Sequence, residues 1–391
     1  MRNIITTVIL LSISLFSYGQ IKELNNAYNN YSNGYLDRAK AAIDKAILND
    51  ITKNEAKTWM YRGNIYLRLA DANDNPKSQD KEYKNLCSNC AEIAFEAYLK
   101  AFELDPNVEV AFQIAKPEQG LEYCATFLAN DAIRLYEKQK YEEASAMAEK
   151  AYKASKSDFV IYIAGITAEM AQKTDLAKTR FTEFVRKKSK MNIVPYVHLA
   201  NIYKMENDTT RALNVFKTTE TLFLSGDTIN VDYAVAYSIV LSWAGKSEEA
   251  TGVMNKALEK DPTNHTLLNN YGSELIKEKR YEEAETYFKR ALSLKPNDPI
   301  TTYNLGNCYY NSFVEKRQSL DKIEDNALYE QEREKSQELL KQAQPYLEDA
   351  HKMDPKDRNT LFMLRLVYAE LGLNSELEII KQKILDLDTK Q

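Results

Sequence analysis

Four cysteines and three histidines are the side chains of this chain best suited to hold a metal ion. Cys87 and Cys90 form a Cys-x-x-Cys pair, which could be half of a zinc site or a reactive dithiol. A structural zinc site needs a second such pair or closely spaced histidines, whereas His198, His265 and His351 stand far apart. We therefore expect no bound metal and no cofactor.

More than one interpretation of Cys87 and Cys90 is consistent with the sequence. Outside the cytosol a local disulfide is favoured over zinc, and two unpaired structural thiols are the plain alternative. Thiol- or metal-dependent activity at this pair is the alternative function from another class. A thioredoxin-like site is not supported, because no strand-helix-strand pattern surrounds the sequence CSNC.

Motifs for catalysis and for nucleic-acid binding are absent from the sequence. It contains no Gly-x-Ser-x-Gly, no His-Glu-x-x-His and no glycine-rich phosphate loop. The net charge of −5 provides no positive field that would attract nucleic acid. We expect no catalytic residue, a protein that is not an enzyme, and no nucleic-acid partner.

The first residues of the chain have the pattern of a secretion signal. Arg2 precedes an almost uncharged apolar run over residues 4–16, and Ser17 and Gly19 are small residues at the positions that a signal peptidase recognises. We interpret residues 1–19 as a signal peptide, so the mature protein is expected in the periplasm or outside the cell. The longest later uncharged run has thirteen residues, too few for a transmembrane segment, which needs about 20.

The rest of the chain is organised by a sequence repeat of 34 residues. Its best example has apolar or small residues on one face of each of two helices, followed by a proline that ends the second helix. These residues are Leu268, Tyr271, Gly272 and Leu275, then Tyr281, Ala284, Phe288 and Ala291, then Pro296. The period recurs between Ala250 and Ala284, Ala257 and Ala291, Pro262 and Pro296, and Gly272 and Gly306.

This spacing resembles the tetratricopeptide repeat (TPR). The resemblance implies an all-α fold, an α-solenoid in which antiparallel helix pairs stack into a right-handed superhelix. The expected domains are the signal peptide 1–19, the solenoid 20–357 and a C-terminal capping helix pair 358–391. The expected repeats are 20–55, 56–107, 125–157, 158–192, 193–230, 231–264, 265–298 and 299–357.

Two of these units carry insertions. In the repeat at 56–107 the second helix is expected to begin only near Ala91. In the repeat at 299–357 the inserted residues 311–342 keep helical apolar spacing, which predicts that both helices lengthen into a projecting hairpin.

The resemblance also implies where a ligand binds. In this family the first helix of each pair lines an inner groove, and ligand contacts come mostly from positions 2, 5, 6, 9, 12 and 13. Amides and tyrosines predominate at these positions, and amides can both donate to and accept from a peptide backbone. The implied groove residues are Asn64, Arg68, His198, Asn201, Lys204, Asn269, Asn270, Ser273, Lys277, Tyr303, Asn304, Asn307, Tyr310 and Asn311.

The sequence therefore favours a non-enzymatic exported scaffold that holds a peptide or a segment of another protein in its groove. An accessory factor for envelope assembly or secretion is the alternative within the same class. The lysines of the chaperone-binding carboxylate clamp are missing, since Met60, Val197 and Asn269 occupy the fifth position. A chain-terminal carboxylate is therefore not the indicated ligand.

Overall fold

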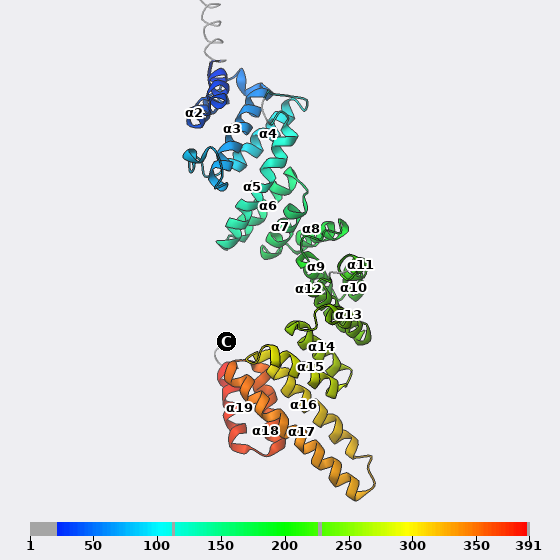
Figure 1. Ribbon diagram of the computed structural model, residues 1–391. Helices are drawn as coiled ribbons and strands as arrows, with labels where there is room; N and C mark the ends of the chain where they lie inside the picture. The colour runs from blue at the N-terminus through cyan, green and yellow to red at the C-terminus, as the bar shows by residue number, and fades with distance from the viewer. Residues whose placement is uncertain (1–21, 112–113, 226–228, 389–391) are drawn as a thin grey trace, which may run out of the picture. The chain divides into compact units, whose positions relative to one another are not determined.

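The structure contains helices where the repeating apolar spacing of the sequence predicts them. The computed structural model describes residues 22–111, 114–225 and 229–388, so the predicted signal peptide lies outside the described residues. Within these ranges the chain forms α-helices joined by turns and short 3-10 segments, with no strand (Figure 1). The predicted all-α solenoid is confirmed. The chain divides into two compact units, Met1–Pro195 and Tyr196–Gln391, and each is described by itself.

The first unit begins with helical residues 22–32 and continues with successive antiparallel helix pairs. Its further elements are α2 (Leu36–Ala46), η1 (Thr52–Asn54), α3 (Ala56–Asp74), η2 (Lys81–Tyr83), α4 (Cys90–Leu104), α5 (Pro117–Glu137), α6 (Tyr141–Ala154), α7 (Asp158–Met170) and α8 (Thr174–Arg186). The predicted insertion at 56–107 is the segment between α3 and α4. The helix α5 is the first helix of the repeat expected at 125–157, and it starts earlier, at Pro117. Proline is well suited to the first turn of a helix.

The second unit contains most of α9 and all of the later helices, and its pairs again pack in sequence order. The elements are α9 (Val194–Met205), α10 (Thr209–Lys217), α11 (Glu220–Phe223), α12 (Val231–Trp243), α13 (Ser247–Lys260), α14 (His265–Lys277), α15 (Tyr281–Leu294), α16 (Pro299–Leu320), α17 (Asn326–Met353), α18 (Arg358–Leu371) and α19 (Asn374–Asp388). The second helix of the repeat at 193–230 is split into α10 and α11. Thr219 lies at the split, and its hydroxyl donates to the carbonyl of Val215.

Small residues on first helices let the two members of a pair approach closely. A Cβ atom added to Gly272 of α14 would stand 2.8 Å from the ring of Phe288 on α15, and one added to Gly165 of α7 would stand 2.4 Å from the ring of Phe181 on α8. Both rings are fully buried. Each aromatic side chain therefore fills the space that a missing side chain leaves, which is how the repeat achieves close packing.

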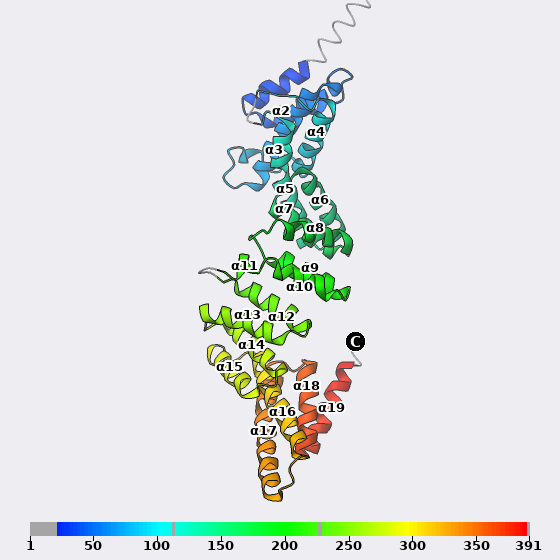
Figure 2. The ribbon, with the colours of Figure 1, turned by 90° about the vertical axis from the view of Figure 1, so that its right-hand side faces the viewer.

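The inserted residues 311–342 lengthen α16 and α17, as the sequence pattern predicts. These helices have 22 and 28 residues, compared with 13 and 14 in the preceding pair α14 and α15. Figures 1 and 2 show α16 and α17 side by side, with their joined ends projecting beyond α15.

The start of α16 is fixed by a buried carboxylate. Asp298 caps the helix, accepting hydrogen bonds from the Thr301 N–H at 2.9 Å and from the Thr301 hydroxyl at 2.7 Å, and it pairs with Lys295 at 2.7 Å. Burial by itself would raise the pKa of this carboxyl. Lys295, both Thr301 groups and His265 outweigh that effect and lower the pKa to about 2.

We expect Asp298 to contribute acid-sensitive stability. Its folded-state pKa lies below the ordinary 3.8, so the contribution is fully present above about pH 4 and is lost as the pH falls toward 2. Asp298→Asn keeps a capping side chain but removes the charge. The variant should lose less helicity than wild type between pH 4 and 2, measured by circular dichroism. An unchanged acid transition would contradict the assignment.

Candidate functional site

The first helices of the second unit form a continuous surface. The helices α12, α14, α16 and α18 contact one another in this order, while α13, α15 and α17 each pack between consecutive first helices. We define the inner face as positions 2, 5, 6, 9, 12 and 13 of these four helices, counted from Val231, His265, Pro299 and Arg358. Most of the predicted groove residues lie on this surface.

A ladder of side-chain hydrogen bonds joins three of these helices across the inner face. The amide nitrogen of Asn304 on α16 donates to Asn269 Oδ1 on α14 at 2.9 Å and to Ser273 Oγ at 3.4 Å. On α14 the Lys277 ammonium donates to Ser242 Oγ of α12 at 2.5 Å. The structure therefore brings together Asn269, Ser273 and Asn304, which the sequence singled out separately.

The predicted tyrosines of α16 are half-buried on the same face. Burial raises the pKa of Tyr303, and the nearby Asp357 carboxylate raises it further. Burial also raises the pKa of Tyr310, with a contribution in the same direction from Glu370. Both phenols therefore remain protonated at neutral pH, where each can donate a hydrogen bond.

Three predicted residues lie on α9, which precedes this set of helices. Asn201 and Lys204 are exposed, and His198 is half-buried. The Lys204 ammonium lies 5.8 Å from the ring centre of Trp243 on α12. This cation–π contact connects α9 to Trp243, which itself occupies an inner-face position of α12.

The remaining predicted residues, Asn64 and Arg68, are used inside the first unit. Asn64 is 1% exposed, and its amide accepts a hydrogen bond from the hydroxyl of Tyr98 at 2.8 Å. The Arg68 guanidinium pairs with Asp80 of the α3–α4 insertion and lies 5.0 Å from the ring centre of Tyr31. These contacts stabilise the unit, and both side chains also line a hollow of about 500 Å³ in it.

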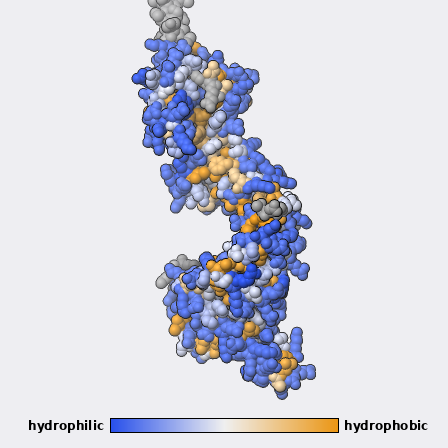
Figure 3. Space-filling model, in the orientation of Figure 1, coloured by the Kyte–Doolittle hydropathy of each residue, from blue (hydrophilic) through white to orange (hydrophobic). Residues whose placement is uncertain are grey.

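Large apolar side chains are exposed on the inner face, and the sequence analysis did not select them. Ile239 is 53% exposed, Ile300 64% and Phe362 48%, and they lie on α12, α16 and α18. Figure 3 shows orange side chains near the start of α16 and around α9–α12 on a mainly blue surface. All three occupy positions of the ligand-contact pattern, which would have found them had the search not favoured polar side chains.

The comparisons with known proteins agree with the helix pairs. Residues 265–298, which form α14 and α15, match the tetratricopeptide repeat family model. The chain therefore contains a tetratricopeptide repeat at these residues. No curated protein matches it.

Several solved TPR structures resemble the chain at low identity. The C-terminal part of a TPR repeat-containing protein from Cytophaga hutchinsonii is 17% identical, with 67% of this chain and 96% of that chain covered and a TM-score of 0.44. YrrB, described as a TPR protein with an unusual peptide-binding site, is 19% identical over 53% of this chain and 96% of its own, with a TM-score of 0.37. MamA from Desulfovibrio magneticus is 17% identical over 50% of this chain and 94% of its own, again with a TM-score of 0.37.

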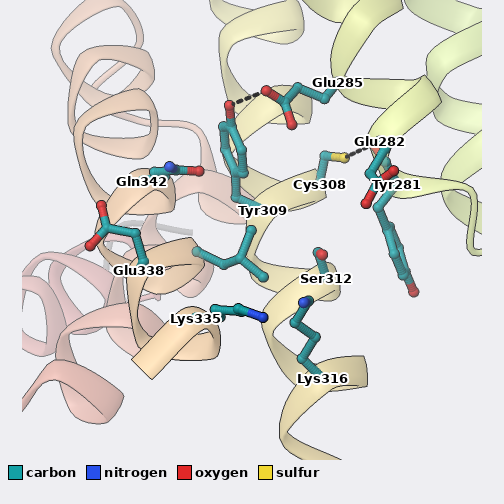
Figure 4. Close-up of a pocket in the computed structure, with 11 residues that line it drawn as sticks. Tyr281, Glu282, Glu285, Cys308, Tyr309, Ser312, Lys316, Lys335, Glu338 and Gln342 are labelled. Atoms are coloured by element: carbon teal, nitrogen blue, oxygen red, sulfur yellow. Dashed lines mark hydrogen bonds between the residues drawn. The ribbon is translucent and has the colours of Figure 1, made fainter. Parts of the chain in front are cut away.

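A hollow of about 300 Å³ lies in the second unit, where the lengthened α16 and α17 meet α15 (Figure 4). The Tyr309 hydroxyl donates to Glu285 at 2.9 Å, and the buried Cys308 thiol points toward the Tyr281 carbonyl at 3.4 Å. Burial raises the pKa of Cys308 to about 12. The thiol is therefore protonated at neutral pH and is a poor nucleophile.

Of the other cysteines, Cys124 lies on α5, Cys90 begins α4, and Cys87 lies in the α3–α4 insertion. Cys87 and Cys90 are paired as a disulfide, with Cα atoms 5.5 Å apart. The Asn73 amide donates to the Cys87 carbonyl at 2.7 Å, which holds the same segment against α3. No group of three or more potential metal ligands occurs in the described ranges. Nor does any helix in those ranges have the length and apolarity that a membrane crossing requires.

We expect the purified protein to contain two free thiols rather than four. Under denaturing, non-reducing conditions a thiol reagent should label Cys124 and Cys308 alone, because Cys87 and Cys90 are bonded. Mass spectrometry of the labelled peptides measures this directly. Labelling of all four cysteines would show that the pair is reduced.

Proposed function

We propose that this TPR protein is an exported, non-enzymatic scaffold that binds a segment of another protein on the inner face of its second unit. Tetratricopeptide repeats generally serve as protein-interaction scaffolds. Export depends on residues 1–19 acting as a signal peptide, which places the protein in the periplasm or outside the cell.

The observation that carries the proposal is the exposure of Ile239, Ile300 and Phe362 at inner-face positions of α12, α16 and α18. Scattered apolar side chains are normal on a protein surface, whereas several large ones at equivalent positions of stacked helices are consistent with a binding surface. The amides and tyrosines between them supply hydrogen-bonding groups. Together they combine exposed apolar and aromatic residues with hydrogen-bonding groups, as protein interfaces do.

Crosslinking in the native cell envelope tests the proposal. We expect wild type to capture one or more specific proteins, and Ile239→Asp/Ile300→Asp to lose them, because two carboxylates would have to be desolvated in the interface. The matched control is Leu294→Asp, which changes an exposed apolar residue of the second helix α15. Capture that survives the double substitution, or that Leu294→Asp removes equally, would refute the inner face as the site.

Fractionation tests the export step separately. The mature chain should appear in the periplasm or the medium and should begin near Gln20 by N-terminal sequencing. A chain that stays in the cytoplasm with residues 1–19 attached would refute export and leave the binding surface unaffected.

A further inference from the structure

The hollow in the first unit is bordered by α3, α5 and the α3–α4 insertion. Its volume of about 500 Å³ lies within the roughly 300–1,000 Å³ that is usual for small-molecule sites. Figures 1 and 2 show the insertion as a loop beside α3. Tyr31 of the first helical segment and Ile114, which precedes α5, also line the hollow. The insertion thus adds a wall to a surface that consecutive helix pairs alone would leave open.

The wall that the insertion forms is held in place by contacts with α3. The Arg68 guanidinium donates through Nε to Asp80 Oδ2 at 2.8 Å. At the other end of the insertion, the Asn73 amide donates to the Cys87 carbonyl at 2.7 Å. A ligand that enters the hollow therefore does not have to order this segment, which lowers the entropic cost of binding.

Four charged side chains line the hollow, and two of them pair with each other. Arg68 and Asp80 form an ion pair. The Asp71 carboxylate and the Lys77 ammonium have no ion-pair partner among the residues that the structure describes. The Asn75 amide donates to Asp71 Oδ1 at 2.9 Å, which leaves Oδ2 as an acceptor for a ligand. The hollow therefore offers one negative and one positive group.

The α5 side of the hollow is aromatic. Tyr123 and Phe127 lie one turn apart on this helix, opposite Leu67 of α3. Tyr123 is 57% exposed, so most of its surface is free to contact a ligand. The ring of Tyr31 is already covered, because the Arg68 guanidinium lies 5.0 Å from its centre. An aromatic ligand would consequently pack against the rings of α5.

We infer that this hollow binds a free amino acid with an aromatic side chain. Asp71 accepts hydrogen bonds from the ammonium of the ligand, Lys77 donates to its carboxylate, and Tyr123 and Phe127 pack against its ring. A zwitterion pairs with both charges of the hollow, whereas an amine or an acid alone pairs with one. A segment within a peptide chain carries neither end charge. The site belongs to the first unit and does not depend on the inner face of the second.

Four related compounds test the ligand class on the purified full chain by equilibrium dialysis. They are L-phenylalanine, phenethylamine, which lacks the carboxylate, 3-phenylpropionate, which lacks the ammonium, and N-acetylphenylalanine amide, which lacks both charges. We expect L-phenylalanine to bind saturably at one site and each of the others at least about tenfold more weakly, because one or both charges of the hollow then lack a partner. No saturable binding of L-phenylalanine, or equal binding of all four compounds, would overturn the inference.

Substitutions at the two unpaired charges connect binding to the hollow. Asp71→Asn should weaken binding of L-phenylalanine and phenethylamine at least about tenfold and leave that of 3-phenylpropionate unchanged. Lys77→Gln should weaken binding of L-phenylalanine and 3-phenylpropionate and leave that of phenethylamine unchanged. The matched control is Lys81→Gln, an exposed lysine of the same insertion outside the hollow, which should change none of them.

Tyr123→Ala is the variant that tests the aromatic wall. It should weaken binding of all four compounds, because each contains the same phenyl ring. Circular dichroism confirms that each variant is folded before binding is compared. Binding of L-phenylalanine that survives Asp71→Asn, Lys77→Gln and Tyr123→Ala would show that the amino acid binds elsewhere and would overturn the assignment of the hollow.

Discussion

Replacing Tyr98 with alanine is expected to lower the free energy of unfolding of the first unit by about 3–5 kcal/mol, the range for deleting a large buried aromatic side chain. Tyr98 of α4 is fully buried. Its ring occupies the space beside Gly63 of α3 and Gly120 of α5, where added Cβ atoms would stand 2.5 Å and 2.3 Å from it. One side chain therefore packs against the first helices of two successive pairs.

The loss should exceed what apolar contact alone supplies. The Tyr98 hydroxyl donates to Asn64 Oδ1, so its removal leaves a buried acceptor without that bond. Thermal unfolding followed by circular dichroism measures the effect. The matched control is Tyr123→Ala on α5, because Tyr123 is 57% exposed and should change the melting temperature little. Equal effects of the two substitutions would contradict the packing described for Tyr98.

Replacing Gly272 with leucine is expected to destabilise the second unit by about 1–3 kcal/mol through overpacking. A Cβ atom at this position would already meet the ring of Phe288 at 2.8 Å, and a leucine side chain has further atoms to place. Phe288 is fully buried and has little room to move. The helices α14 and α15 would therefore have to separate.

Gly252→Leu is the control for the Gly272 substitution. Gly252 lies within α13, and a Cβ atom there would meet nothing within 4 Å. Leucine is a better helix former than glycine by roughly 0.5–1 kcal/mol, so the control should keep or raise the melting temperature. A fall of the same size in both variants, or no fall for Gly272→Leu, would refute the close approach of α14 and α15.

Two asparagines at the same position of their repeats differ in burial. Asn64 and Asn201 both occupy the ninth position of their repeats. In the structure Asn64 is buried beneath Tyr98, whereas Asn201 is exposed. Position in the repeat therefore identifies the helix face but does not say whether that face is open to a ligand.

The sequence by itself determined the helices and their pairing. The clearest unit, at 265–298, has its own apolar period, small residue and closing proline, and these act between neighbours in the chain. Gly272 and Phe288 illustrate this, because their contact lies within one helix pair. Local spacing was enough to predict it.

Only the tertiary structure decided which surfaces are open. The α3–α4 insertion pairs its Asp80 with Arg68, a contact that no repeat pattern specifies. Asn304 and Asn269 meet only because α14 and α16 stack, and the exposure of Ile300 depends on what packs beside it. Periodicity specifies contacts within a helix pair, whereas exposure depends on insertions and neighbouring repeats that the period does not encode.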